Sequence, residues 1–163
     1  MKISEKLRLR LLGWAQKRME KPQDFTIGEA SNPYLHRWWV FRWKYLCCIY
    51  IHHFLQSDDA RALHNHPWYN LSILLEGVYV EHTKDGSFRR EPGFIYFRSP
   101  WRAHRIELLK DAESGELLPV TTLFITGPKI RNWGFLCPQG FVPWWEYVSV
   151  RPGGNGIGRG CDE

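Results

Sequence analysis

Two patterns of hydrophobic and polar positions divide the chain into a short helical segment and a long series of strands. Residues 3–20 repeat apolar positions at the spacing of one helix face, with charged residues on the opposite face. The apolar positions on that face are Ile3, Leu7, Leu11 and Trp14. This pattern predicts a helix over 3–20, with Ser4 in the capping position. Beyond residue 34 the pattern changes to the short apolar runs and alternations that are typical of strands.

Turn signals separate these strands. Asp85-Gly86 and Pro92-Gly93 are the clearest, and the segments between the turns are rich in β-branched and aromatic residues. The expected strands are 37–43, 45–55, 71–76, 78–83, 87–90, 94–98, 104–109, 120–126, 132–136 and 144–150. Many short strands without a second helix predict an all-β protein, either a barrel or a double-sheet sandwich.

A single domain accounts for the length of the chain. Residues 1–21 form the helical segment, 22–33 a connector, 34–150 the barrel and 151–163 a glycine-rich, irregular tail. An aromatic content of 15%, with nine Trp, fits a barrel that encloses a ligand cavity.

The positive charge is confined to the helical segment. Residues 1–21 contain seven basic and two acidic residues, which account for the whole net charge of +5. Because the rest of the chain is balanced, we expect no nucleic-acid partner, and no apolar run is long enough to predict a membrane span. We expect the helix to pack on the outside of the domain or on a partner subunit, and contact with nucleic acid or a membrane surface is the weaker alternative.

The cysteines indicate a compartment rather than a zinc site. Cys47, Cys48, Cys137 and Cys161 include no C-x-x-C pair, which excludes a zinc ribbon. No signal-peptide pattern is visible, so we expect a reducing, cytoplasmic setting with Cys137 as a buried structural cysteine.

His64 and His66 are the strongest candidates for chemistry. Residues two apart on an extended segment point to the same side, so both imidazoles face one way. His104 comes from a later expected strand and could complete a three-nitrogen metal site.

The spacing around these histidines resembles the two motifs of the cupin superfamily. After His64 and His66, Asn70 stands where the first motif has Glu, and Gly77 keeps the Gly that follows it. The leading Gly position of that motif holds Asp58. In the second motif Gly93 and His104 keep the spacing of the first and last members, with Pro100 displaced by one position. The resemblance implies a double-stranded β-helix, the cupin jelly-roll barrel, preceded here by one N-terminal α-helix.

Longer stretches are similar to a group of small cupins from phages and bacteria. They run from His52-His53-Phe54-Leu55 to Trp68 and from Leu123 to Pro128, followed by Trp133-Gly134-Phe135 and Trp145. This resemblance covers residues 34–150 and implies a fold and a metal site rather than a particular reaction.

The resemblance implies that His64, His66 and His104 are metal ligands. Asn70 either coordinates weakly through its amide oxygen or leaves a neutral three-histidine set, as in cupin thiol dioxygenases. A neutral set leaves a divalent metal its full charge for an anionic substrate or for oxygen. Iron is the first expectation, with manganese, zinc or nickel as alternatives. Without a metal, the three histidines would be polar residues of a pocket.

Other candidate residues flank the ligands. His52 or His53 must face inward, and we name His52 and Tyr96 as acid–base candidates and Arg102 as a candidate for binding a substrate carboxylate or phosphate. A core histidine, a core tyrosine and a surface arginine are the respective alternatives. Candidate hydrogen-bond partners of the ligand imidazoles are Asp58, Asp59 and Glu107.

Two further groups belong to the expected cavity. By strand alternation Ser72 and Glu76 share the face of Asn70, with Glu76 expected near the exposed barrel end. Trp68, Tyr96 and Trp101 are candidates for the cavity wall.

Three functions fit these residues. The first is a metal-dependent enzyme acting on a small molecule, foremost a non-haem Fe(II) dioxygenase. The second is a non-catalytic cupin that binds a ligand or serves in assembly, through the basic helix and the aromatic stretch around Trp38 and Trp39. The third is a metal-free sugar-nucleotide epimerase or isomerase, with His52 and Tyr96 across the pocket. We also expect a homodimer, with the aromatic stretch Trp38 to Trp43 in its contact.

Overall fold

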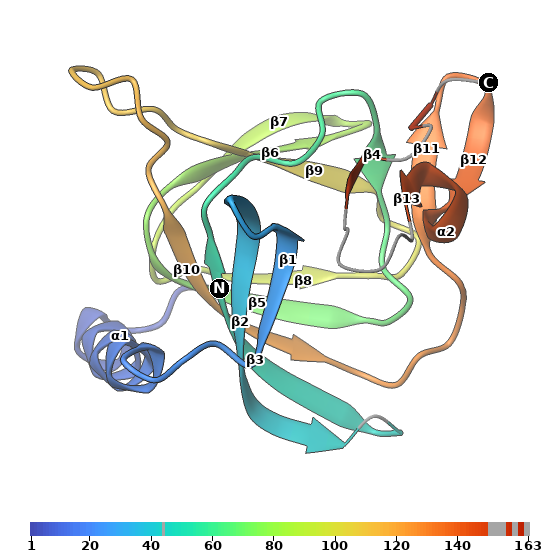
Figure 1. Ribbon diagram of the computed structural model, residues 1–163. Helices are drawn as coiled ribbons and strands as arrows, with labels where there is room; N and C mark the ends of the chain where they lie inside the picture. Colours follow the sequence, from blue (N-terminus) through green and yellow to red (C-terminus); the bar gives the residue numbers. More distant parts are fainter. Residues whose placement is uncertain (44, 150–155, 158–159, 162–163) are drawn as a thin grey trace.

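The computed structural model describes residues 1–43, 45–149, 156–157 and 160–161. Two antiparallel six-stranded sheets face each other, and helix α1 (Glu5–Met19) lies outside one of them (Figure 1). The first sheet has the order β1 (Phe25–Glu29), β2 (Asn32–Trp43), β3 (Cys47–Phe54), β10 (Val120–Thr126), β5 (Asn70–Glu76) and β8 (Ile95–Arg98). The second has the order β12 (Gly140–Pro143), β11 (Gly134–Cys137), β4 (Leu63–His64), β9 (His104–Leu108), β6 (Tyr79–Thr83) and β7 (Gly86–Arg90). The predicted all-β jelly roll with an N-terminal helix is therefore confirmed.

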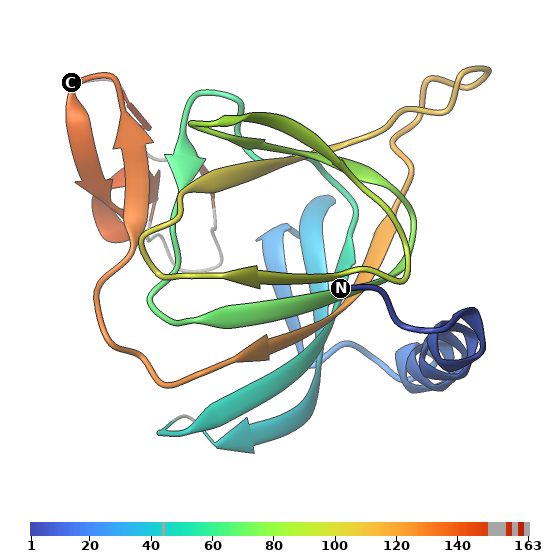
Figure 2. The same cartoon turned by 180° about the vertical axis from the view of Figure 1, so that it is seen from behind.

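Helix α1 packs on the barrel of its own chain. Its N-terminus is capped as predicted, because the Ser4 hydroxyl accepts a hydrogen bond of 3.3 Å from the backbone N–H of Leu7. Leu12 and Ala15 are buried in a cluster that includes Trp38 from the first sheet. Seen from behind, the helix lies beside the outer face of that sheet (Figure 2). The face that packs on the barrel differs from the expected one: Leu11 and Met19 pack beside Leu12 and Ala15, whereas Leu7 and Trp14 are 45% and 44% exposed.

The expected aromatic contact with a partner required Trp38 to lie on the surface, but Trp38 is buried. It lies under α1, and its indole N–H donates a hydrogen bond of 2.8 Å to the carbonyl oxygen of Lys21. Trp39, on the other face of the strand, packs edge-on against Tyr50 with ring centroids 4.9 Å apart.

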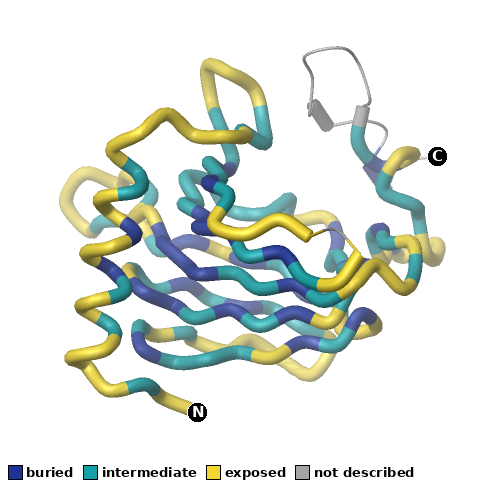
Figure 3. Tube along the Cα trace, turned by 90° about the horizontal axis from the view of Figure 1, so that it is seen from below, coloured by how far each residue is buried: buried dark blue, intermediate teal, exposed yellow. Residues whose placement is uncertain are grey.

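Strand alternation gives the first sheet two different faces. Trp38, Ile51 and Leu123 are paired in register on the outer face under α1. One position away, Arg37, His52 and Thr122 are paired in register on the inner face. Figure 3 shows buried and half-buried positions along the strands, with exposed positions gathered in loops and on α1. The inner face is the one that carries candidate chemistry.

Two expected elements differ from the structure. The connector over 22–33 contains strand β1, an edge strand whose pairing with β2 shifts at Gly28. Bulges and glycines are tolerated at sheet edges, and there they hide the strand pattern. The strand expected over 144–150 instead begins as the single-turn helix α2 (Trp144–Tyr147), followed by β13 (Val148–Ser149). Tyr147 stacks on Phe135 with ring centroids 3.6 Å apart, so a tertiary contact overrides the strand propensity of its aromatic residues.

The C-terminal segment is tied to the barrel by a disulfide. Cys137, expected as a buried structural cysteine, is bonded to Cys161 with a Cα–Cα distance of 5.4 Å. The expected irregular tail over 151–163 lies largely outside the described residues, although β14 (Gly156–Ile157) pairs with β13. A disulfide is not what a reducing compartment predicts, so the cytoplasmic setting stays a prediction. No helix in the described part of the chain is both long and apolar enough to cross a membrane.

Candidate metal centre

Three histidines converge as predicted. His64 on β4 and His104 at the start of β9 are partners in register, and His66 follows β4 by two residues. One ligand nitrogen from each lies within 4.8 Å of the other two. The closest pair is Nε2 of His66 and Nε2 of His104, at 2.9 Å. The pairing of β4 with β9 in the second sheet thus brings His66 and His104 together, although they lie 38 positions apart in the sequence.

The donor set fits a divalent transition metal. Two imidazole nitrogens about 2.1 Å from one ion, at an angle of about 90°, stand about 3.0 Å apart, close to the observed separation. Metal ligation also needs neutral imidazoles. Burial lowers the pKa of His104 to about 4, and burial followed by the charges of His64 and His104 lowers that of His66 well below its ordinary value. Both side chains are therefore neutral near neutral pH.

Glu81 on β6 holds His104 in the orientation that a metal ligand needs. The Nδ1–H of His104 donates a hydrogen bond of 2.8 Å to Oε1 of Glu81, which leaves Nε2 directed at His66. Glu81 is only 1% exposed and also accepts from Arg98 Nε at 2.6 Å and Arg90 Nε at 2.7 Å. Burial alone would raise the pKa of Glu81, but the bond from His104 and the charge of Arg98 outweigh it and lower the pKa. Glu81 is therefore a buried carboxylate with a full charge.

Asp58, one of the three acidic candidates, is the acidic neighbour of His64. Its Oδ2 lies 3.6 Å from Nδ1 of His64 and accepts a hydrogen bond of 2.5 Å from the backbone N–H of Ile106. The hydroxyl of Tyr34 donates to the other carboxylate oxygen. These contacts fix Asp58 against β9, beside the ligand.

The other two acidic candidates bind elsewhere. Asp59 accepts hydrogen bonds from Arg61 and, at 2.9 Å, from the hydroxyl of Tyr147. Glu107 lies on the exposed face of β9 and pairs with His82 at 2.7 Å. Neither contacts a ligand histidine.

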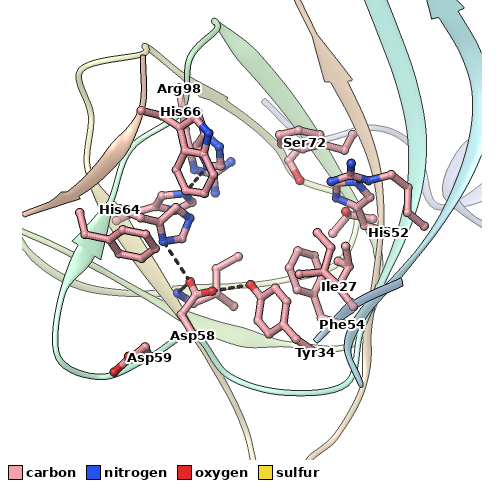
Figure 4. A pocket seen from close by; sticks show the side chains of 18 of the residues that line it. Ile27, Tyr34, His52, Phe54, Asp58, Asp59, His64, His66, Ser72 and Arg98 are labelled. Atoms are coloured by element: carbon pink, nitrogen blue, oxygen red, sulfur yellow. Dashed lines mark hydrogen bonds and ion pairs between the residues drawn. The ribbon is translucent and has the colours of Figure 1, made fainter. Parts of the chain in front are cut away.

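A cavity of about 440 Å³ opens beside the three histidines. Figure 4 shows His64, His66 and Arg98 on one side of it, His52 and Ser72 on the opposite side, and Asp58 with Tyr34 between them. Aromatic and aliphatic side chains form much of the remaining wall: Ile27, Phe54, Trp68, Ile106, Phe124, Trp133 and Phe135. Such a cavity, apolar with a few convergent polar groups, suits a small organic ligand.

His52 is the inward-facing member of the His52–His53 pair. It lines the cavity, whereas His53 contacts the Thr121 hydroxyl at 3.1 Å on the outer face. Nε of Arg37 donates a hydrogen bond of 2.9 Å to Nε2 of His52. Since arginine stays protonated, His52 must accept on Nε2 and carry its proton on Nδ1. Burial and the charge of Arg37 lower the pKa of His52 well below its ordinary value.

Tyr96 and Arg102 do not line the cavity. Tyr96 packs on the apolar cluster around Tyr79, and its hydroxyl accepts a hydrogen bond of 3.1 Å from the backbone N–H of Glu91. Arg102 is exposed on the turn after β8. The epimerase hypothesis requires Tyr96 to face His52 across the cavity, and the structure does not place it there.

Asn70 and Glu76 lie on β5 but differ in environment. Asn70 is buried but is not among the residues that line the cavity, and both polar atoms of its amide lack a hydrogen-bond partner among the described residues. Its role as a ligand stays a prediction. Glu76 is exposed, because a register shift in the pairing of β5 with β10 after Leu74 breaks the alternation and places Glu76 opposite Thr121 on the outer face.

Glu81, Arg98 and Arg37 are the polar residues of the site that sequence reasoning missed. Glu81 alternates with Tyr79 on one face of a predicted strand, which is a sign of an inward-facing acid. Trp101, by contrast, was expected in the wall and is 62% exposed.

Comparison with solved structures establishes the fold. An uncharacterised protein with a double-stranded β-helix domain from Klebsiella pneumoniae is 15% identical, with a TM-score of 0.50 over 74% of this chain and 87% of that one. A DMSP lyase from Ruegeria pomeroyi matches at 11% identity, a TM-score of 0.49 and 74% and 60% coverage. A cupin superfamily protein from Desulfitobacterium hafniense matches at 15% identity, a TM-score of 0.46 and 66% and 94% coverage.

Among these three likenesses, the first, with a TM-score of 0.50, supports the double-stranded β-helix fold and no more. No protein-family model matches the chain, and no curated protein does. At such low sequence identity, the structural likeness establishes the fold alone. The chain thus has the double-stranded β-helix fold, and its His64, His66 and His104 form a cluster that could bind a metal ion.

Proposed function

We propose that the protein is a metal-dependent enzyme that acts on a small molecule in the barrel cavity, with oxygen as co-substrate. The observation that supports it is the convergence of three imidazoles at the wall of a largely apolar cavity. His64, His66 and His104 would hold a divalent ion, with iron as the first choice. Bound iron(II) with open coordination positions would supply the activation of oxygen.

The remaining residues bind, orient and exclude water. Glu81 fixes the ring of His104 through its Nδ1–H, and Asp58 stands beside the ring of His64. The aromatic wall around Phe124 and Phe135 keeps water from the bound molecule, which strengthens electrostatic contacts inside the cavity. The donor set carries no negative charge, so a bound divalent ion would keep its full charge.

Oxygen uptake tests this proposal. Protein loaded anaerobically with iron(II) is mixed with small organic acids in oxygenated buffer, and oxygen consumption and product formation are recorded. We expect turnover with at least one compound, and a loss of about 100-fold or more in the His66→Ala variant. His82→Ala is the matched control, because His82 contacts Ser87 and Glu107 outside the cavity. Iron binding without substrate-dependent oxygen uptake would contradict the proposal and favour a non-catalytic, ligand-binding cupin.

A homodimer is proposed from one exposed surface. Phe41, Trp43 and Leu46 are each about half exposed at the end of the β2–β3 hairpin. Exposed aromatic groups of this kind are typical of protein contacts. Gel filtration of the Phe41→Ser/Trp43→Ser variant tests it: we expect a dimer in the wild type and a monomer in the variant, and a monomeric wild type would contradict it.

A further inference from the structure

Arg37 is a cationic group of the cavity whose charge the protein leaves without a counter-charge. It lines the cavity from β2, next to His52 in register on β3. Its Nε donates a hydrogen bond to His52, and the guanidinium carbon lies 4.8 Å from the centre of the Tyr50 ring. Among the described residues, no carboxylate lies within ion-pair distance of it. Because the guanidinium packs on an aromatic ring and its Nε is bound to His52, the terminal nitrogens of Arg37 can bind a ligand.

His52 cannot neutralise Arg37. It accepts the bond from Nε of Arg37 as a neutral ring, so the pair carries one positive charge. Burial is the main factor that lowers the pKa of Arg37, and two tyrosines and a cysteine, not a carboxylate, act against it. Buried charges in proteins are usually paired, so a lone guanidinium in a cavity wall indicates an anionic ligand.

The charges of the wall limit this ligand to one negative group. In the described lining, Arg37 and Arg98 are the arginines and no lysine occurs. The charge of Arg98 is already compensated by Glu81, whose Oε1 lies 2.6 Å from Nε of Arg98. Asp58 and Asp59 line the same cavity and would repel a second negative charge. The rest of the wall is largely apolar, which suits an apolar body on the same molecule.

The distance across the cavity is short. The ring of Phe124 stands between the two sites, with its centroid 4.9 Å from that of His52 and 6.0 Å from that of His66. A molecule anchored beside His52 therefore needs about the length of one aromatic ring and a short side chain to reach His66.

We propose that the cavity takes a small monocarboxylate with an apolar body, whose carboxylate is bound by Arg37 and whose other end faces His64, His66 and His104. The identification of this molecule as the substrate rests on the proposed function. The anion site at Arg37 is independent of that function.

Calorimetric titration of metal-free protein tests the anion site. Phenylacetate and phenylacetamide have the same shape, but only the first carries a charge. We expect phenylacetate to bind about tenfold or more tightly, since a charge-assisted hydrogen bond is worth about 1.5–3 kcal/mol. In Arg37→Met this preference should disappear while the affinity for phenylacetamide stays within about twofold. Arg42→Met is the matched control, because Arg42 lies on the same strand but is exposed over Trp39.

Each outcome decides the proposal. Equal affinities in the wild type, no detectable binding of phenylacetate, or a preference that survives in Arg37→Met would overturn it. The wild-type comparison needs no variant, so misfolding of Arg37→Met cannot hide the result. Because the protein is metal-free, a failed metal site does not affect the titration. A protein that prefers phenylacetate through Arg37 but takes up no metal would refute the proposed function alone.

Discussion

Replacement of Glu81 by Gln tests the buried charge network behind the ligand histidines. The carboxylate is 1% exposed and accepts hydrogen bonds from Arg98, Arg90 and His104 at 2.6, 2.7 and 2.8 Å. Gln keeps the shape but removes the charge, which leaves the guanidinium of Arg98, 4% exposed, buried without a counter-charge. Removal of one member of a buried ion pair costs about 3–5 kcal/mol. Arg90 is 19% exposed and contributes less, because water can solvate it.

Urea unfolding of the metal-free protein measures this effect. We expect Glu81→Gln to lower the free energy of unfolding by about 3–5 kcal/mol. Glu107→Gln on the neighbouring strand is the matched control: its side chain is 47% exposed, so we expect a loss of at most about 1 kcal/mol. A Glu81→Gln protein as stable as Glu107→Gln would refute the role assigned to the buried network.

Three further predictions concern pH, the disulfide and the helix. In the metal-free protein, burial lowers the pKa of His104 from 6.5 to about 4, so between these values the unfolded chain binds more protons and stability must fall as the pH falls; thermal unfolding of the metal-free protein across this range checks it. Cys161→Ser should lower the free energy of unfolding by about 2–4 kcal/mol, and thiol titration of the denatured wild type should detect Cys47 and Cys48 alone before reduction. Ala15 is 0% exposed against the first sheet, so the larger side chain of Ala15→Leu should lower the free energy of unfolding by about 1–3 kcal/mol in the same urea assay.

The parts of the structure that follow from local pattern were predictable. The helix and its Ser4 cap depend on residues a few positions apart, and so does the shared direction of His64 and His66. His104 joined the site through the spacing of the second motif, and the structure pairs it with His64. Alternation likewise required one of His52 and His53 to face inward.

The missed features depend on contacts between distant segments. Glu81 becomes a partner of His104 only when β6 and β9 pair in a particular register, which periodicity does not specify. The exposed position of Glu76 was expected, but the bulge beyond Leu74 that places it opposite Thr121 was not, because alternation alone does not locate a bulge. Trp38 belongs to a strand that looks half-exposed until α1 covers its outer face.

Elemental analysis of protein purified without added metal shows whether His64, His66 and His104 bind a metal ion. We expect about one divalent transition-metal ion per chain in the wild type and in His82→Ala, with the metal lost in His66→Ala although that variant remains folded by circular dichroism. A wild type that holds no metal and takes none up from solution, or a His66→Ala variant that keeps the wild-type content, would contradict it.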